Sequence, residues 1–449
     1  MSKDIHMHKH ADQAAVGVKG TVERETSVEA EDHTRSAYLW NTAGSLLNAF
    51  QSVIMLMVIT RVSDLETAGV FTLAYASANL FLNMGNYGMR NFQASDVKPQ
   101  YPFASYWRSR LVTDIAMLVC SSAYLLWSAT RLAYPSAKSA AIVVMMLLKL
   151  VDSVEDITDG NCQQHGRLDV GGKLLTLRTG SFICVFIVSM VLLRSLVTSL
   201  TITVAWSLAF YIVGIMIIRS RVGLPTGKGD PDMPAWHGAW RLLRECAPLF
   251  LAAFLLFYIG NAAKYAIDAQ LDDASQAIYG FIAMPVFVVG LLAQFIYMPI
   301  VEPLSRTWDA GDATGFRREF SRQALYIAGI TLVCDLGGFI LGEPVLGWLY
   351  ATDLAGYGLD LVVLVTGGGF LALAQLFTMG ITVMRRQRLL TPGYVAVALV
   401  ALLTASPVVA RWGIDGASWA YIAYMAVLAL LFAGIFLRCS ACPVKPATT

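Results

Sequence analysis

Residues 219–241, with the sequence RSRVGLPTGKGDPDMPAWHGAWR, form the longest polar, Gly- and Pro-containing stretch between the apolar segments of this chain. The sequence on either side of it is strongly apolar. Hydrophobic residues make up 56% of the 449 positions and charged residues only 14%, whereas a soluble globular protein has roughly 25% charged residues. Because a water-exposed surface needs more charge than this, the composition excludes a soluble fold and predicts an all-α integral membrane protein.

Twelve apolar segments are long enough to cross a bilayer, whose hydrocarbon core of about 30 Å takes about 20 helical residues. Six of them precede the quoted stretch and six follow it. The sequence therefore predicts twelve transmembrane helices in two six-helix lobes, a common plan for transporters. The third, fourth and ninth segments carry internal charge. The predicted spans are 38–60, 67–89, 106–129, 139–159, 171–194, 198–218, 242–267, 274–300, 322–342, 356–382, 392–410 and 416–438.

These spans divide the chain into five regions. The N-lobe is predicted at 38–218 and the C-lobe at 242–438, with a cytoplasmic linker at 219–241 between them. Polar tails precede and follow the lobes, at 1–37, expected to be disordered, and at 439–449.

The distribution of lysine and arginine predicts the orientation of these helices. With the N-terminus placed inside, 25 of the 33 basic residues fall in inside segments and 6 at outside ends or loops. Basic loops stay in the cytoplasm. We therefore predict a multi-pass protein of the cytoplasmic membrane with both termini inside, which agrees with an even number of helices.

Polar residues form stripes along three of the predicted helices. At 100° per residue, side chains three and four positions apart lie on one face. Two interpretations are open: hydrogen bonds that hold packed helices together, or the wall of a water-filled cavity. The cavity is favoured because each stripe runs for about two or three turns. The stripes comprise Asn41, Ser45, Asn48 and Ser52; Asn79, Asn83, Asn86 and Arg90; and Tyr258, Asn261, Lys264, Tyr265 and Asp268, while Gln294 and Gln375 are isolated.

Ionisable residues concentrate in the fourth segment, and such residues are too costly to face lipid. They form either a buried ion-pair network that fixes packing or a proton or cation site that couples transport; for Lys149, near mid-membrane, the functional interpretation is favoured. Lys149, Asp152, Asp156 and Asp159 share one face, Glu155 lies beside them, and Asp114 and Arg178 fall at similar depth in neighbouring segments. The candidate ion-coupling residues are Asp114, Asp152, Glu155 and Asp156.

Sequence motifs of common enzymes are missing. The chain contains no G-x-x-x-x-G-K-[ST] nucleotide-binding loop, no G-x-S-x-G and no H-E-x-x-H. The predicted external loops are short. These absences argue against an ATPase and against an enzyme, although an intramembrane active site stays open, and they suggest no metal or cofactor.

The run YIGNAAKYAIDAQLDDASQAIYGFIAMPVFVVGLLAQFIYMPIVEPL at 258–304 resembles the polysaccharide-type flippases of the multidrug/oligosaccharidyl-lipid/polysaccharide exporter superfamily. Within it, the matching pieces are Asn261 with the run 264–268, Tyr279-Gly280, Pro285 and Pro299. The segments at 85–90, 345–354 and 384–388 are also similar to that family.

The resemblance implies two six-helix lobes around a central cavity. It also implies alternating-access movement of a polyprenyl-pyrophosphate-linked oligosaccharide to the outer leaflet, for capsule, O-antigen or exopolysaccharide synthesis. The expected partners are this substrate, membrane lipids, and glycosyltransferases or a polymerase of the same pathway, but not nucleic acid. A cation-coupled multidrug antiporter of the same fold and a membrane enzyme of glycan assembly are the alternatives.

An anionic, hydrated headgroup needs cations, hydrogen-bond donors and aromatic faces along its passage. The candidate cavity residues are therefore the cations Arg61, Arg90, Lys149, Arg178 and Lys264, the amides Asn41, Asn48, Asn83, Asn261 and Gln294, and the aromatic residues Tyr258 and Tyr265.

Overall fold

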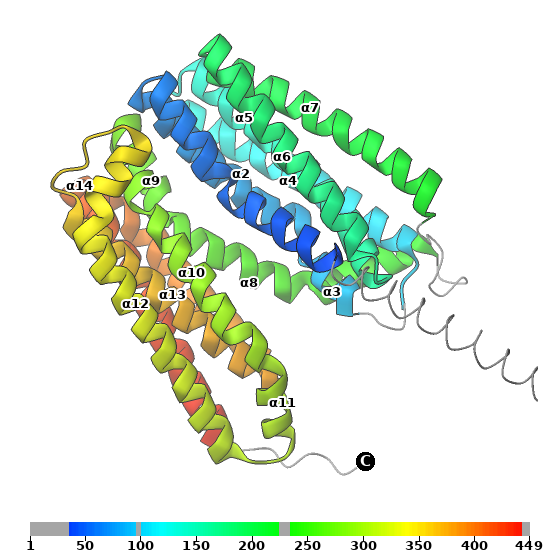
Figure 1. Ribbon diagram of the computed structural model, residues 1–449. Helices are drawn as coiled ribbons and strands as arrows, with labels where there is room; N and C mark the ends of the chain where they lie inside the picture. The colour runs from blue at the N-terminus through cyan, green and yellow to red at the C-terminus, as the bar shows by residue number, and fades with distance from the viewer. Residues whose placement is uncertain (1–35, 96–99, 224–233, 442–449) are drawn as a thin grey trace, which may run out of the picture.

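The computed structural model describes residues 36–95, 100–223 and 234–441, and most of these residues are helical (Figure 1). The described part of the chain contains no β-strand. An all-helical fold was predicted and is confirmed. Residues 1–35 of the predicted tail 1–37, most of the C-terminal tail and the central part of the predicted linker lie outside the described residues, and residues 36 and 37 belong to the first helix.

The helices follow one another with short connections. The first half of the chain consists of the helix Ser36–Val62, α2 (Leu65–Asn86), α3 (Met89–Ser95), α4 (Phe103–Arg131), α5 (Ser136–Gln164), α6 (Leu168–Leu193) and α7 (Leu196–Ile217). The second half consists of α8 (Ala235–Gln270), α9 (Asp273–Ile282), α10 (Met284–Tyr297), α11 (Val301–Asp309), α12 (Ala313–Tyr350), α13 (Gly358–Val383) and α14 (Leu390–Ala441). Short π- and 3₁₀-turns lie at Ile218–Val222, Met298–Ile300 and Gln387–Leu389.

Nine helices in the described ranges are long and apolar enough to cross a membrane. This set treats α14 as one helix, although its backbone leaves helical geometry at Gly413 (φ 60°, ψ −137°), between the predicted spans 392–410 and 416–438. It omits α2, which contains three asparagines, and α5, which carries five ionisable residues between Lys149 and Asp159. A multi-pass membrane protein is therefore confirmed, whereas the count of twelve crossings stays a prediction.

Several helices extend beyond the apolar segments that predict them. The helix α8 begins at Ala235, within the predicted linker, and α12 covers Ala313–Tyr350, although the prediction was 322–342. Trp236 and Trp240 lie on the added turns of α8 and are 48% and 63% exposed. Hydropathy detects only the part of a helix that lies in hydrocarbon, while tryptophan and arginine continue the same helix into the membrane interface.

Two groups of helices are visible in Figure 1. The N-terminal helix group contains the helices of residues 36–217, and the C-terminal helix group contains α9 to α14. The helix α8 runs between them and packs against α2 and α4 on one side and α14 on the other. The two groups approach each other near α9 and diverge towards the end where α7 stops and α8 begins (Figure 1).

The groups meet where α2 crosses α9. Both helices begin at the same end of the molecule, each after an aspartate cap: Asp64 accepts a hydrogen bond from the Thr67 backbone N–H at 2.7 Å, and Asp272 accepts one from Ser275 at 2.8 Å. The hydrogen bond from the Thr67 backbone N–H lowers the pKa of the Asp64 carboxyl group. The crossing is close because Gly69 has no side chain, and a Cβ there would collide with the backbone carbonyl of Asp273.

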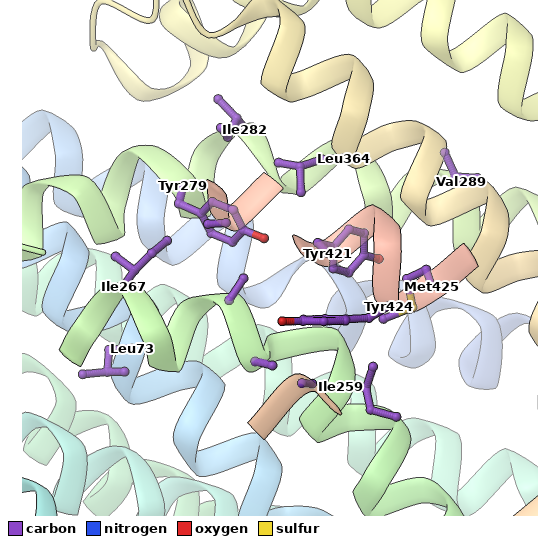
Figure 2. Close-up of a cluster of buried hydrophobic side chains, with 14 of the residues drawn as sticks. Leu73, Ile259, Ile267, Tyr279, Ile282, Val289, Leu364, Tyr421, Tyr424 and Met425 are labelled. Carbon is purple, nitrogen blue, oxygen red and sulfur yellow. The ribbon is translucent and has the colours of Figure 1, made fainter. Parts of the chain in front are cut away.

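A buried apolar cluster joins α2 and α8 to the C-terminal helix group (Figure 2). Helices in lipid gain little from the hydrophobic effect, so close van der Waals packing of this kind holds them together. Figure 2 labels Leu73 of α2, Ile259 and Ile267 of α8, Tyr279 and Ile282 of α9, Val289 of α10, Leu364 of α13, and Tyr421, Tyr424 and Met425 of α14.

Candidate functional site

A cavity of about 620 Å³ lies between the two helix groups. Its walls come from the helix Ser36–Val62, α2 and α8 on one side, and from α9, α10, α13 and α14 on the other. Residues far apart in sequence therefore line one space, which is the geometry of a binding site between two halves of a chain.

One wall of the cavity carries a row of amides and one hydroxyl. Asn48 and the hydroxyl of Ser52 come from the first helix, Asn79 and Asn83 from α2, and Asn261 from α8. Asn83 donates to the Asn79 carbonyl at 2.8 Å, and Asn261 donates to the Phe257 carbonyl at 3.0 Å. An amide has two N–H donors and an acceptor oxygen, so each side chain keeps hydrogen-bonding capacity for a ligand after this bond.

The opposite wall is mostly apolar and aromatic. Its one amide among the described residues is Gln375 of α13, whose side-chain oxygen accepts a hydrogen bond from the Tyr297 hydroxyl at 3.0 Å. The cavity is therefore amphipathic, with its polar wall on the N-terminal side. The apolar lining on the C-terminal side comprises Val286, Phe287, Leu364, Leu371 and Tyr421.

Lys264 is the only charged side chain among the described residues that line this cavity. Within the described ranges its ammonium group forms no ion pair or hydrogen bond with another residue. Lys264 is half-buried. A cation partly withdrawn from water without a counter-ion is costly, and an anionic ligand would supply the missing partner through charge-assisted hydrogen bonds. The cavity is therefore suited to an anionic group.

Four of the twelve predicted cavity residues line this cavity: Asn48, Asn83, Asn261 and Lys264. Tyr258 and Tyr265 of α8 lie outside the lining and stack on each other, with ring centroids 6.0 Å apart. The Tyr265 hydroxyl donates to the Ala76 carbonyl at 3.2 Å and so fixes α8 against α2.

Three more predicted residues, Asn41, Arg61 and Gln294, are not part of the cavity lining. Asn41 lies where the first helix packs closely on Gly172 of α6. Arg61 lies at the far end of that helix and donates to the Trp348 carbonyl at 3.0 Å, with its guanidinium over the Trp348 ring. Gln294 of α10 is exposed and is not among the residues that line the cavity.

The other three predicted cations, Lys149, Arg178 and Arg90, are paired inside the N-terminal helix group. Lys149 Nζ lies 2.8 Å from Asp152 Oδ2. Arg178 donates to Asp152 Oδ1 at 2.7 Å and, through Nε, to Glu155 Oε2 at 2.8 Å. Lys149 and Arg178 are each only 1% exposed. One aromatic ring, that of Tyr75, lies between this cluster and the cavity, because Lys149 Nζ is 4.9 Å from the ring centroid and Tyr75 lines the cavity.

A second cluster lies further along α5. Arg110 Nη2 lies 2.7 Å from Asp156 Oδ2, and Arg90 Nη1 lies 3.4 Å from Asp159 Oδ2. Arg110 also donates to the Gly85 carbonyl and is 1% exposed. The sequence analysis did not single out Arg110 of the predicted span 106–129; the signal was its position one turn before Asp114.

The candidate ion-coupling acids thus lie in these clusters or beside them, away from the cavity lining. Asp152, Glu155 and Asp156 each have an arginine partner, and Asp114 accepts a hydrogen bond from Ser153 Oγ at 2.6 Å. This pairing is the arrangement expected of a network that fixes packing.

The described helices form a bundle with an amphipathic cavity between two helix groups, and comparison with solved structures finds the same fold in several membrane proteins. The chain is similar to lipid II flippase MurJ in an inward closed conformation, with a TM-score of 0.64 at 10% identity, over 89% of this chain and 90% of that one. It is also similar to an inward-facing multidrug resistance MATE family transporter of the MOP superfamily, with a TM-score of 0.62 at 10% identity, over 89% and 96% of the two chains.

A third similar structure is a MOP superfamily transporter from Pyrococcus furiosus, with a TM-score of 0.55 at 12% identity, over 90% of this chain and 94% of that one. No protein-family model matches the sequence, and no curated protein matches it. At these identities the comparisons concern the fold: the chain has the fold of the MOP-superfamily transporters and flippases.

Proposed function

We propose that this protein is a flippase that moves a polyprenyl-pyrophosphate-linked oligosaccharide across the cytoplasmic membrane by alternating access. In this proposal the two helix groups, together with α8, are two six-helix lobes with twelve membrane crossings, and both termini lie in the cytoplasm. The product would feed the synthesis of a surface polysaccharide, in a pathway with glycosyltransferases or a polymerase.

The single observation that carries the proposal is the unpaired Lys264 beside a row of amides. A pyrophosphate is a dense anion and forms strong charge-assisted hydrogen bonds with an unpaired ammonium group. Sugar hydroxyls donate and accept hydrogen bonds, as do Asn48, Asn79, Asn83 and Asn261. The apolar opposite wall suits the start of a lipid chain. One cavity therefore offers complementary groups to each part of such a substrate.

The shape of the bundle supports movement from the cytoplasmic to the outer side. The helix groups are in contact at the α2–α9 crossing and diverge at the opposite end (Figure 1). With the termini inside, the divergent end is the cytoplasmic one, and this conformation is the one that receives substrate. Release outside then requires the α2–α9 end to part while the other end closes.

A cation-coupled drug antiporter of the same fold is the second candidate, favoured by the likeness to the MATE transporter. Such a protein is expected to have an acidic residue in its cavity to bind cationic drugs or coupling ions. Among the described lining residues there is a lysine and no aspartate or glutamate. The charge of the cavity therefore supports the anionic substrate.

Deletion of the gene in its own host separates the two candidates. We expect surface polysaccharide to be lost, with lipid-linked oligosaccharide accumulating on the cytoplasmic side and drug susceptibility unchanged. Restoration by the wild-type chain is the control. Increased drug susceptibility with normal surface polysaccharide would reject the flippase in favour of the antiporter.

A further inference from the structure

A buried cluster of charge joins the two helix groups at the end where they meet. Lys138 lies in the first turn of α5, Asp268 near the end of α8 and Asp273 in the first turn of α9. The Lys138 Nζ atom is 2.8 Å from Asp268 Oδ1 and 2.6 Å from Asp273 Oδ1. The Tyr134 hydroxyl donates to Asp268 Oδ2, and the Lys138 ammonium lies 4.5 Å from the centroid of the Tyr134 ring. We call Lys138, Asp268 and Asp273 the interlobe clasp.

The position of the clasp distinguishes it from the other ion pairs. In the described ranges, each of the remaining ion pairs lies within one helix or within the N-terminal helix group. Among the described cations of the N-terminal helix group, Lys138 alone pairs with carboxylates from the second half of the chain. The side chains of Lys138 and Asp268 are 8% and 2% exposed, so water has little access to this pair.

The clasp also lies on the seam that closes the cavity. Along α9 from Asp273, Tyr279 and Gly280 line the cavity, and a Cβ on Gly280 would lie 2.7 Å from Thr72 of α2. The same two helices touch at Gly69 and Asp273. These contacts between α2 and α9 therefore close the path from the cavity to this end of the molecule. The ion pair of Lys138 with Asp273 holds the start of α9 in place.

We propose that the interlobe clasp is the outer closure of the transport pathway, and that separation of Lys138 from Asp268 and Asp273 is the step that opens the cavity outward. This inference rests on the proposed topology, which places the clasp on the outer side. Buried charges gain Coulomb energy in the closed state and hydration in the open state. Because these two terms nearly offset each other, the clasp gives two discrete arrangements with a small free-energy difference, as a switch requires.

Accessibility to a membrane-impermeant maleimide applied to intact cells tests this proposal. Thr72→Cys, in a chain without its native cysteines, places the thiol on the seam, where Thr72 is 7% exposed. Asp353→Cys, at an exposed position between α12 and α13 at the same end, reports the topology. We expect Thr72→Cys to label slowly and Lys138→Met to accelerate its labelling at least about tenfold, while Lys138→Arg leaves it near the original rate.

The outcomes are separable. If Asp353→Cys is not labelled from outside, the proposed topology is wrong, whatever the clasp does. If Asp353→Cys labels equally in all variants and Lys138→Met leaves the labelling rate of Thr72→Cys unchanged, the proposal that the interlobe clasp closes the pathway is rejected. Should Lys138→Met fail to reach the membrane, Asp273→Asn is the milder variant, because Asp268 still neutralises Lys138. It must then accelerate labelling relative to Arg322→Met, which removes an exposed pair within α12 alone.

Discussion

At the scale of a residue, Lys264 shows that polar residues spaced along one face of a helix can predict a side chain that lines the cavity. The spacing of Asn261 and Lys264 on one face indicated a polar surface, and both side chains line the cavity. The same reasoning placed Lys149 and Arg178 in the cavity, where the structure pairs them with Asp152 and Glu155. A stripe gives the face on which a side chain lies, but it does not identify the neighbouring helix that supplies a counter-charge.

Lys264 therefore gives the first prediction. Replacing it by glutamine removes the cation but keeps a hydrogen-bonding side chain of similar length. Hydrogen bonds to charged groups contribute about 1.5–3 kcal/mol, so we expect binding of a polyprenyl pyrophosphate to weaken by about tenfold to 100-fold. Native mass spectrometry of the protein in nanodiscs measures this binding.

The matched control is Lys173→Gln, at an exposed position on α6. It removes the same charge away from the cavity and should leave binding unchanged. Equal affinities of the Lys264→Gln variant and the wild type would show that Lys264 does not contact the anion.

At the scale of elements, hydropathy predicted where helices cross hydrocarbon but not where they end. The additional turns of α8 and α12 carry tryptophan and charged residues, which lower the hydropathy of a window without interrupting a helix. The helix α14 is interrupted at Gly413, between two predicted spans. Glycine readily adopts the positive φ found there, and this lets the chain change direction. The fourth segment was singled out for its charges, and α5 is where those charges are paired.

The charge network of α5 gives the second prediction. Arg178→Leu leaves Glu155 without its only described ion-pair partner and removes one partner of Asp152. Breaking a buried pair from one side costs about 3–5 kcal/mol, so the thermal midpoint of unfolding in detergent should fall sharply. Arg322→Leu, which removes an exposed pair on α12, is the control and should cost less than about 1 kcal/mol.

Transport measured on the same variants separates the two interpretations of this network. A structural network predicts that Arg178→Leu loses transport together with folded protein. Transport lost at unchanged stability would instead favour a role in ion coupling.

The α2–α9 crossing gives the third prediction. A methyl group at Gly69 collides with the carbonyl of Asp273, a backbone atom that cannot rotate away. Gly69→Ala should therefore force α2 and α9 apart and raise outside labelling of Thr72→Cys. Gly337→Ala on α12, where the added atom meets open space, is the control. Unchanged labelling in Gly69→Ala would mean that this contact does not keep the seam closed.

At the scale of the whole molecule, the polar stretch 219–241 predicted a division into two six-helix lobes, which stays a prediction; Figure 1 shows two helix groups with α8 between them. The place of α8 between these groups and the closure at α2–α9 could not be predicted. Both features depend on contacts between side chains of different helices, for example that of Lys138 with Asp273, 135 positions apart. Local sequence patterns contain no information on such pairs.

The central claim is that the cavity carries a lipid-linked oligosaccharide between leaflets. The most direct test is the transfer of a fluorescent polyprenyl-pyrophosphate oligosaccharide in proteoliposomes, followed by quenching from one side of the membrane. We predict that the purified protein transfers the labelled lipid much faster than protein-free vesicles do, and that Lys264→Gln reduces this rate at least about tenfold. Transfer at the rate of protein-free vesicles, by a protein shown to be folded and inserted, would contradict the account.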